Sequence, residues 1–147
     1  MDTISVYLDN CCYNRPYDDQ SQLRISLETQ AKLHIQQLIV DKKLNLVYSY
    51  ISVYENFRNP NINRKTSIAD FFKNASVYVD ESYSEKILSE AAKIMETGVK
   101  KMDSLHIAAA IIGKADYFLS TDIRLLKYQT DKIQVINPVN FIYVPEV

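Results

Sequence analysis

Glycine is scarce in this chain, which holds only two among 147 residues, Gly98 and Gly113. The P-loop and the dinucleotide-binding fingerprint both need glycines only a few residues apart. The sequence therefore excludes these two kinds of glycine-rich nucleotide site. Only four prolines are present, which leaves little room for low-complexity linkers. We predict one compact domain over residues 1–147.

Excess charge and long apolar runs are missing as well. Seventeen basic residues nearly balance eighteen acidic ones, and the formal net charge is -1, so bulk charge gives no reason to expect nucleic-acid binding. No apolar run approaches the length of a membrane span, and no signal-peptide core is present, so we expect neither membrane insertion nor export. The only cysteines are Cys11 and Cys12, whose adjacency argues against a structural disulfide and favours a reduced, cytoplasmic compartment.

Strand-like and helix-like segments alternate along the sequence. Runs of β-branched and aromatic residues predict strands at 4–8, 44–48, 76–79, 117–120 and 133–136. Apolar periodicity predicts helices at 21–43, 50–59, 63–74, 82–96, 102–112 and 123–128, with a polar loop at 11–20. This order is typical of an α/β sandwich with a mainly parallel sheet, which binds ligands at the carboxyl ends of its strands.

Four acidic residues stand at the ends of these segments. Asp9 and Asp122 follow the first and fourth strands, Asp103 opens an apolar helix, and Glu55 lies on the helix after the second strand. Each has an ordinary local explanation as a turn residue, a helix cap or a partner of Arg58. Together, four carboxylates near one sheet edge would repel one another unless they gain protons or hold a cation. An oxygen-rich cluster favours Mg²⁺ or Mn²⁺, and such sites are typical of phosphodiester hydrolysis.

Four ordered segments resemble the acidic motifs of PIN-domain ribonucleases, namely YLDNCCYNRP, SVYENF, MDSLHIAAA and LSTD. The resemblance extends from about Val6 to Phe141. The chain is similar in particular to the small, VapC-like members of the family, which are toxins of toxin–antitoxin pairs. The resemblance implies a three-layer α/β/α sandwich with a five-stranded parallel sheet. It also implies Mg²⁺- or Mn²⁺-dependent cleavage of RNA, an antitoxin protein as partner and a homodimer.

The resemblance carries the metal-binding and catalytic positions of the family onto Asp9, Glu55, Asp103 and Asp122. Within that set, the three aspartates are expected to bind the metal, directly or through water, and Glu55 to hold metal waters or orient the nucleophile. Thr121 matches the hydroxyl residue that precedes the last acid and is expected to steady it or bind a water. Asn10 is expected to support Asp9 in the same way.

Other residues offer weaker expectations. Arg15, Arg58 and Tyr13 are candidates for contact with RNA phosphates or bases, although ordinary surface or core positions also explain them. His106 follows Asp103 by three residues and is either a support for the acidic site or a core histidine. An alternative to the nuclease is a non-catalytic binding module that docks a basic partner at the acidic pocket. A receiver-like protein would need a lysine after the last strand and paired acids near the first, and that pattern is absent.

Overall fold

A parallel sheet forms the centre of the computed structural model, which describes residues 3–147. Its strands are β1 (Ser5–Leu8), β2 (Asn45–Ser49), β3 (Val77–Val79), β4 (Tyr117–Leu119) and β5 (Gln134–Ile136). All four neighbouring pairs are parallel, and the strand order is β3-β2-β1-β4-β5. The five-stranded parallel sheet of the sequence prediction is confirmed.

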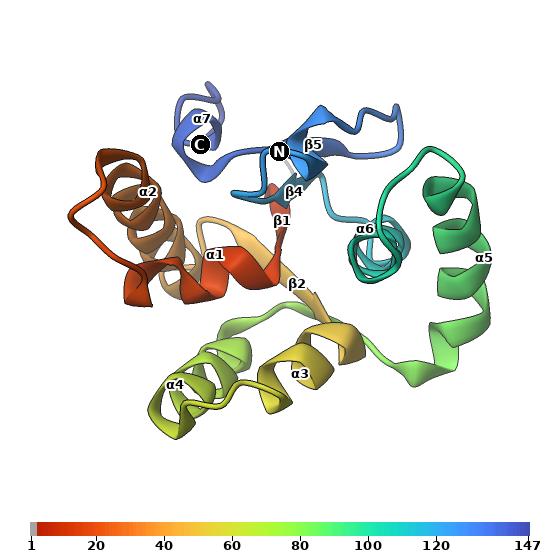
Figure 1. Cartoon of the computed structure of the whole chain (residues 1–147), viewed down its shortest axis with the longest axis horizontal. Helices are drawn as coiled ribbons and strands as arrows, with labels where there is room; N and C mark the ends of the chain where they lie inside the picture. The colour runs from red at the N-terminus through yellow and green to blue at the C-terminus, as the bar shows by residue number, and fades with distance from the viewer. Residues whose placement is uncertain (1–2) are drawn as a thin grey trace.

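Helices connect these strands and cover the sheet (Figure 1). They are α1 (Asn10–Asn14), α2 (Leu23–Val40), α3 (Tyr50–Phe57), α4 (Ile62–Phe71), α5 (Ser84–Met95), α6 (Lys101–Ile112) and α7 (Pro138–Phe141). Ser49 begins α3 with a capping box, in which its side chain accepts from backbone amides and Ser52 bonds back to the Ser49 amide. Pro60 follows α3 and prevents its continuation, as the sequence predicts.

Two apolar clusters lie on opposite faces of the sheet. Along β1, Tyr7 points into one cluster, and Val6 and Leu8 point into the other, because strand side chains alternate. The Tyr7 cluster includes residues of α5 and α6, and the second includes residues of α1, α2, α4 and α7. Figure 1 shows these two groups of helices on either side of the strands. The architecture is therefore a three-layer α/β/α sandwich.

The sheet has one position where its connections change direction. The chain moves outward from β1 to β2 and β3, then returns to β4 on the other side of β1 and ends at β5. The carboxyl ends of β1 and β4 therefore diverge into separate connections, and a crevice opens between them. In parallel α/β sheets this crevice is the usual ligand site.

Three short elements differ from the sequence prediction. The predicted loop at 11–20 contains α1 and a 3-10 turn, because the Asp9 side chain accepts from the Asn10 amide and caps α1. The predicted helix at 123–128 is reduced to a 3-10 turn over Leu125–Lys127. Helix α7 was not predicted, although Asn137 as N-cap followed by proline at the first helical position is a recognised start signal.

Gly113 gives a stability prediction for this fold. A Cβ atom there would lie 2.6 Å from Val47 Cγ1 and 2.8 Å from Val79 Cγ2, both in the sheet. We expect Gly113→Ala to lower the free energy of unfolding by about 1–3 kcal/mol through overpacking, measured by chemical denaturation. Gly98→Ala is the comparison, because a Cβ there meets no atom within 4 Å and only the positive φ of 101° opposes it. An unchanged free energy of unfolding for Gly113→Ala would contradict this prediction.

Candidate active site

The four acidic residues approach one another at the carboxyl ends of β1 and β4. Asp9 follows β1 directly, and Asp122 lies three residues beyond the end of β4. Glu55 lies on α3, and Asp103 lies in the first turn of α6. The charges of Asp122 and Glu55 both act on Asp103, and the charge of Asp103 acts on Asp9. The structure thus brings together all four predicted acids.

Asp9 is the most deeply buried of these acids, with 6% of its surface exposed. Its Oδ1 accepts from the Asn10 amide at 2.8 Å, and its Oδ2 accepts from Ser120 Oγ at 2.9 Å and from Cys11 Sγ at 3.3 Å. Burial raises the pKa of Asp9 well above its usual range, and the nearby Asp103 charge raises it further. The folded protein therefore holds this carboxyl in surroundings that disfavour its negative charge.

Asp103 is about half-buried on α6. Burial raises its pKa, the charge of Asp122 adds to that rise, and His106 opposes it. Asp122 itself is exposed, and its Oδ1 accepts from the Arg124 amide at 2.9 Å. Burial thus decreases from Asp9 through Asp103 to Asp122, so the acidic cluster has a buried end and an exposed end.

Glu55 is held from inside the protein by a chain of buried side chains. His106 Nε2 bonds Glu55 Oε1, and His106 Nδ1 lies 2.6 Å from the Tyr7 hydroxyl. The Tyr7 hydroxyl also lies 2.7 Å from Ser49 Oγ. Burial raises the pKa of Tyr7, so its hydroxyl keeps its proton. The two ring nitrogens of His106 thus join Tyr7 to Glu55, and the protonation state of the ring sets the donor in each contact. The Glu55 contact is thus with His106 and not the ion pair with Arg58 that was one alternative from the sequence.

Sequence reasoning missed Tyr7 and Ser120 and left His106 undecided. His106 is 1% exposed, so it is a core residue that also contacts the acidic site. Ser120 Oγ donates to Asp9 and accepts from the Asp122 amide at 3.1 Å, which joins the two strand ends. Ser120, one residue before Thr121 in the LSTD segment, is therefore the hydroxyl that donates to Asp9, and the support of Asp122 by Thr121 stays a prediction.

Thr121 and Arg15 have different contacts from those predicted. Thr121 Oγ1 accepts from Arg15 at 2.7 Å, so it joins the turn after α1 to the end of β4. Arg15 also pairs with Asp18 at 2.9 Å and with the buried Glu28 at 3.2 Å. Arg24 pairs with the same Glu28 carboxylate at 3.1 Å. These ion pairs give Arg15 structural contacts, and its role in binding phosphate stays a prediction.

Two further candidates lie beside the first strand. Tyr13 is 3% exposed and packs edge-on against Phe71 and Phe72, so the expectation that it stacks on RNA bases is wrong. Asn10 supports Asp9 through its backbone amide, while its side-chain oxygen accepts from Asn14 Nδ2 at 3.2 Å. The group of Asn10 that contacts Asp9 is its main-chain amide, and its supporting role in the reaction stays a prediction.

The donor atoms of this site are carboxylate oxygens, which are the ligands that a hard cation prefers. Three of the four acids are exposed or partly exposed, so solvent can reach them. Within residues 3–147, no three His, Cys, Asp or Glu side chains are arranged as a closed metal-binding group. Three of the acids have protein partners: Asp9 accepts from Ser120, Glu55 contacts His106, and Asp122 caps the turn that follows it.

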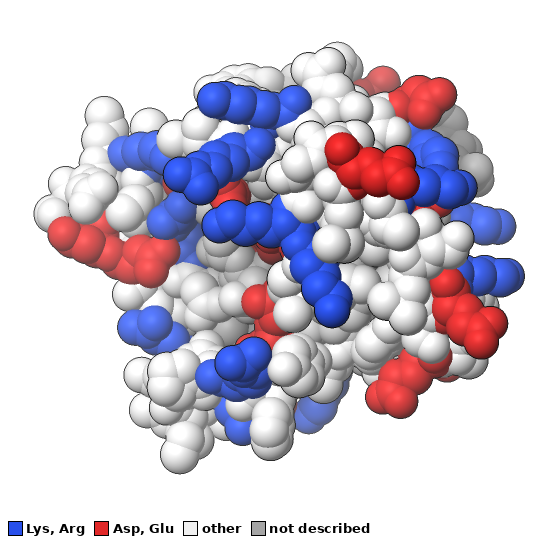
Figure 2. Space-filling view, turned by 45° about the vertical axis from the view of Figure 1, so that its right-hand side comes forward, with Lys and Arg blue, Asp and Glu red and all other residues white. Residues whose placement is uncertain are grey.

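Basic side chains lie around the acidic centre. In Figure 2, acidic side chains are visible in a central hollow, and basic side chains stand on either side of it. Asp103 and Asp122 line one pocket together with Lys100, Arg124 and Lys127. A pocket with Arg58 and Arg64 adjoins Glu55. The surface thus offers positive charge beside the acids, although the whole chain is almost neutral.

Comparisons with known proteins give matches among solved structures. A chain in the crystal structure of VapBC2 from Rickettsia felis, bound to a DNA fragment from their promoter, matches with a TM-score of 0.55 and 14% identity. That match covers 91% of this chain and 98% of the other. A chain in the crystal structure of FitAcB from Neisseria gonorrhoeae matches with a TM-score of 0.59 and 16% identity, over 90% of this chain and 97% of the other.

Comparisons of the sequence itself identify no relative of this chain. No family model matches the chain, and no curated protein matches it either. Among the described residues, no helix combines the length and the apolar character needed to cross a bilayer. Since both structural matches span nearly the whole chain, they establish its architecture. The chain therefore has the PIN-like α/β/α fold of the VapBC2 and FitAcB chains, as its ordered acidic motifs predict.

Proposed function

We propose that this chain is a metal-dependent endoribonuclease that hydrolyses RNA phosphodiester bonds. The observation that carries the proposal is the gathering of Asp9, Glu55, Asp103 and Asp122 at the crevice between β1 and β4. Burial and mutual repulsion raise the pKa of Asp9 and of Asp103, so the metal-free cluster is unfavourable for its own charge. A divalent cation relieves that repulsion, which is a physical reason for the cluster to exist.

Each acid has a proposed part in the reaction. Asp9, Asp103 and Asp122 would hold Mg²⁺ or Mn²⁺, which on binding supplies an activated water and neutralises phosphate charge. Glu55 would accept a proton from the attacking water or orient it, and His106 keeps the carboxylate in place from the protein interior. Ser120 fixes the rotamer of Asp9 through the hydrogen bond to Oδ2. The buried end of the crevice excludes bulk water around Asp9.

We further propose that the chain acts in the cytoplasm as the toxin of a toxin–antitoxin pair and forms a homodimer. The VapBC2 and FitAcB structures support this, since their matching chains have the same fold over nearly their full length. An apolar groove of about 650 Å³ between α3, α5 and α6 is a suitable surface for a protein partner. Its exposed side chains include Tyr54 and Phe57, on the same helix as Glu55. Size-exclusion chromatography with light scattering tests the dimer directly.

The nuclease proposal predicts cleavage that depends on both metal and acid. Purified protein with Mg²⁺ or Mn²⁺ is expected to cleave single-stranded RNA, and a chelator is expected to stop it. Asp103→Asn should reduce the rate about a hundredfold or more, because a charged ligand is lost where charge develops in the transition state. Glu85→Gln, an exposed acid on α5, is the control and should keep the wild-type rate. Metal binding without cleavage by any tested RNA would instead favour the non-catalytic module that docks a basic partner.

A further inference from the structure

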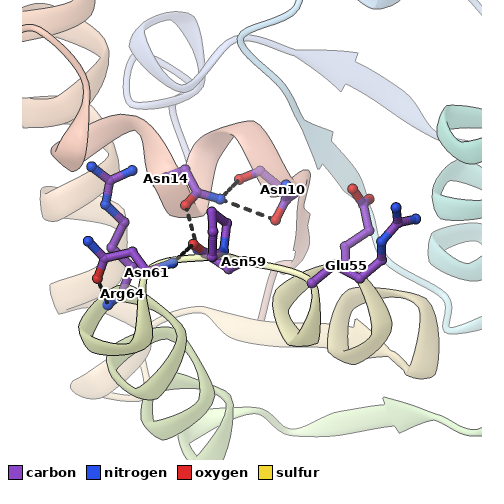
Figure 3. A pocket seen from close by; sticks show the side chains of 8 residues that line it. Asn10, Asn14, Glu55, Asn59, Asn61 and Arg64 are labelled. Atoms are coloured by element: carbon purple, nitrogen blue, oxygen red, sulfur yellow. Dashed lines mark hydrogen bonds between the residues drawn. The ribbon is translucent and has the colours of Figure 1, made fainter.

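We propose that a polar pocket beside Glu55 binds a nucleotide of the single-stranded RNA next to the cleaved phosphate. The pocket has a volume of about 620 Å³, within the ordinary range of small-molecule sites. It is lined by Asn10, Asn14, Glu55, Arg58, Asn59, Pro60, Asn61 and Arg64. Figure 3 shows Glu55 and the asparagines of this pocket. The inference rests on the proposed nuclease function, because the charge of Glu55 also acts on Asp103 of the acidic centre.

Three elements build the pocket and fix its asparagines. Asn14 on α1 donates to the Asn10 carbonyl at 3.0 Å and accepts from Asn59 Nδ2 at 3.1 Å. Asn59, in the connection from α3 to α4, accepts from the Asn61 amide at 3.1 Å. Asn61 then caps α4 by accepting from the Arg64 amide at 3.1 Å. These bonds join α1 to the α3–α4 connection, so the pocket is formed before any ligand arrives.

The amides leave hydrogen-bonding groups for a ligand. Within residues 3–147, the Nδ2 groups of Asn10 and Asn61 donate to no protein acceptor. Each free Nδ2 group is a donor, and the edge of a nucleobase offers acceptor atoms for it. Single-stranded RNA presents such edges, because its bases are unpaired. Duplex RNA would hide them, so the pocket favours a single strand.

The two arginines supply the charge that a phosphate needs. Neither Arg58 nor Arg64 lies within 4.0 Å of a carboxylate oxygen in the described part of the chain, in contrast to Arg15, which pairs with Asp18 and Glu28. Arg58 contacts the Tyr54 hydroxyl at 3.3 Å, and Arg64 lies 4.9 Å from the centre of the Tyr17 ring. Aromatic contacts orient a guanidinium without neutralising it. Both cations are therefore available for RNA phosphates on the strand that passes Glu55.

Removing both guanidiniums tests the pocket directly. The double variant Arg58→Gln/Arg64→Gln is compared with Lys43→Gln/Lys86→Gln, which removes the same charge from exposed lysines after α2 and on α5. The probe is a short labelled single-stranded RNA of mixed sequence, and binding is followed by fluorescence anisotropy in chelator, where a metal-dependent enzyme cannot cleave. We expect the arginine variant to lose at least about tenfold in affinity. Its salt slope should fall by about 1.4, because each single-strand phosphate contact contributes about 0.7.

A second variant tests the amides and keeps the fold. Asn61→Asp retains the oxygen that caps α4, since aspartate is as good an N-cap as asparagine, but it replaces the outward NH₂ with a negative oxygen. We expect an unchanged melting temperature and an affinity for RNA several-fold weaker than that of the wild type. A matched duplex of the same sequence should bind equally to Asn61→Asp and wild type.

The outcomes separate the pocket from the nuclease. If the arginine variant binds RNA as tightly as the lysine control, or keeps the wild-type KM in cleavage, the pocket proposal is overturned even though the nuclease stands. If no preparation cleaves RNA while only the pocket variants lose binding, the pocket is supported as an RNA site and the nuclease proposal fails. Equal losses in the arginine and lysine variants would indicate bulk charge alone and would also overturn the pocket.

Discussion

Asp9→Asn is expected to raise the melting temperature of the metal-free protein and to abolish metal-dependent RNA cleavage at the same time. The carboxyl is 6% exposed and close to Asp103, so its ionised form opposes folding. Asparagine keeps an oxygen for the Asn10 amide and removes the charge. The expected rise is a few degrees, because each kcal/mol shifts the melting temperature of a domain of this size by about 2–4 °C.

The effect of this substitution should depend on pH. Burial raises the pKa of Asp9 above the ordinary 3.8, so the folded state holds a proton that the unfolded state has already released. Its stabilising contribution is therefore complete below pH 3.8 and is lost as the pH rises through the folded pKa. Asp103 contributes in the same direction, because its pKa is also raised. The difference in melting temperature between Asp9→Asn and wild type should be smallest in acid and should grow toward neutral pH.

Calorimetry across this pH range, with and without Mg²⁺, measures the effect. Asp131→Asn, the same change at an exposed position, should leave the melting temperature near the wild-type value at every pH. Added Mg²⁺ should stabilise the wild type and leave Asp9→Asn nearly unaffected, because ligand binding to the folded state raises its stability. A variant that melts earlier than the wild type at neutral pH would show that the Asp9 hydrogen bonds outweigh its charge.

His106→Ala is expected to destabilise the protein and to slow the reaction beyond the effect on stability. Removing a fully buried ring leaves a cavity, and it also leaves the Tyr7 hydroxyl and the Glu55 carboxylate without a shared partner. The expected loss is about 3–5 kcal/mol, judged from large-to-alanine substitutions in cores. Glu55 would then lose its fixed orientation, and kcat should fall about 10- to 100-fold, in line with other groups that orient an active-site ligand.

Ile107→Ala is the matched control for this prediction. Ile107 is equally buried on the same helix, but it does not contact Glu55. Both variants should unfold at lower denaturant concentration, and kcat measured well below either melting temperature should fall only for His106→Ala. His106→Gln should recover part of kcat, since glutamine retains both a donor and an acceptor. Equal kcat values for His106→Ala and Ile107→Ala would show that His106 contributes only to packing and does not orient Glu55.

The sequence predicted the placement of the acids because that placement follows from topology. Asp9 follows a strand, and the LSTD segment follows another, so parallel pairing alone brings both to one edge. The contacts of individual side chains were harder to predict from the sequence. The contact of Thr121 with Arg15 joins residues 106 positions apart, and no local pattern reveals which of two neighbouring hydroxyls, Ser120 or Thr121, turns toward an acid.

Burial of polar groups was the other failure of prediction. Arg15 and Tyr13 lie in a segment rich in polar residues and turn formers, which favours an exposed loop. The structure buries Tyr13 against Phe71 and Phe72, and it pairs Arg15 with Glu28, a carboxylate in the middle of α2 that is 1% exposed. Both outcomes depend on how α1 packs on α2 and α4. This packing is a tertiary effect, and the periodicity of apolar residues along the sequence does not predict it.

The helix cap formed by Asp9 would link the two ligand sites proposed above. Its Oδ1 holds the first amide of α1, and α1 carries Asn10 and Asn14 of the RNA pocket on its five residues. A cation that draws the Asp9 oxygens toward itself acts on the position of this short helix, and a nucleotide held by its asparagines acts back on Asp9. Thermodynamic reciprocity then requires each ligand to change the affinity of the other by the same factor. If both proposals hold, metal and RNA would therefore bind to this chain as a coupled equilibrium and not as two independent ones.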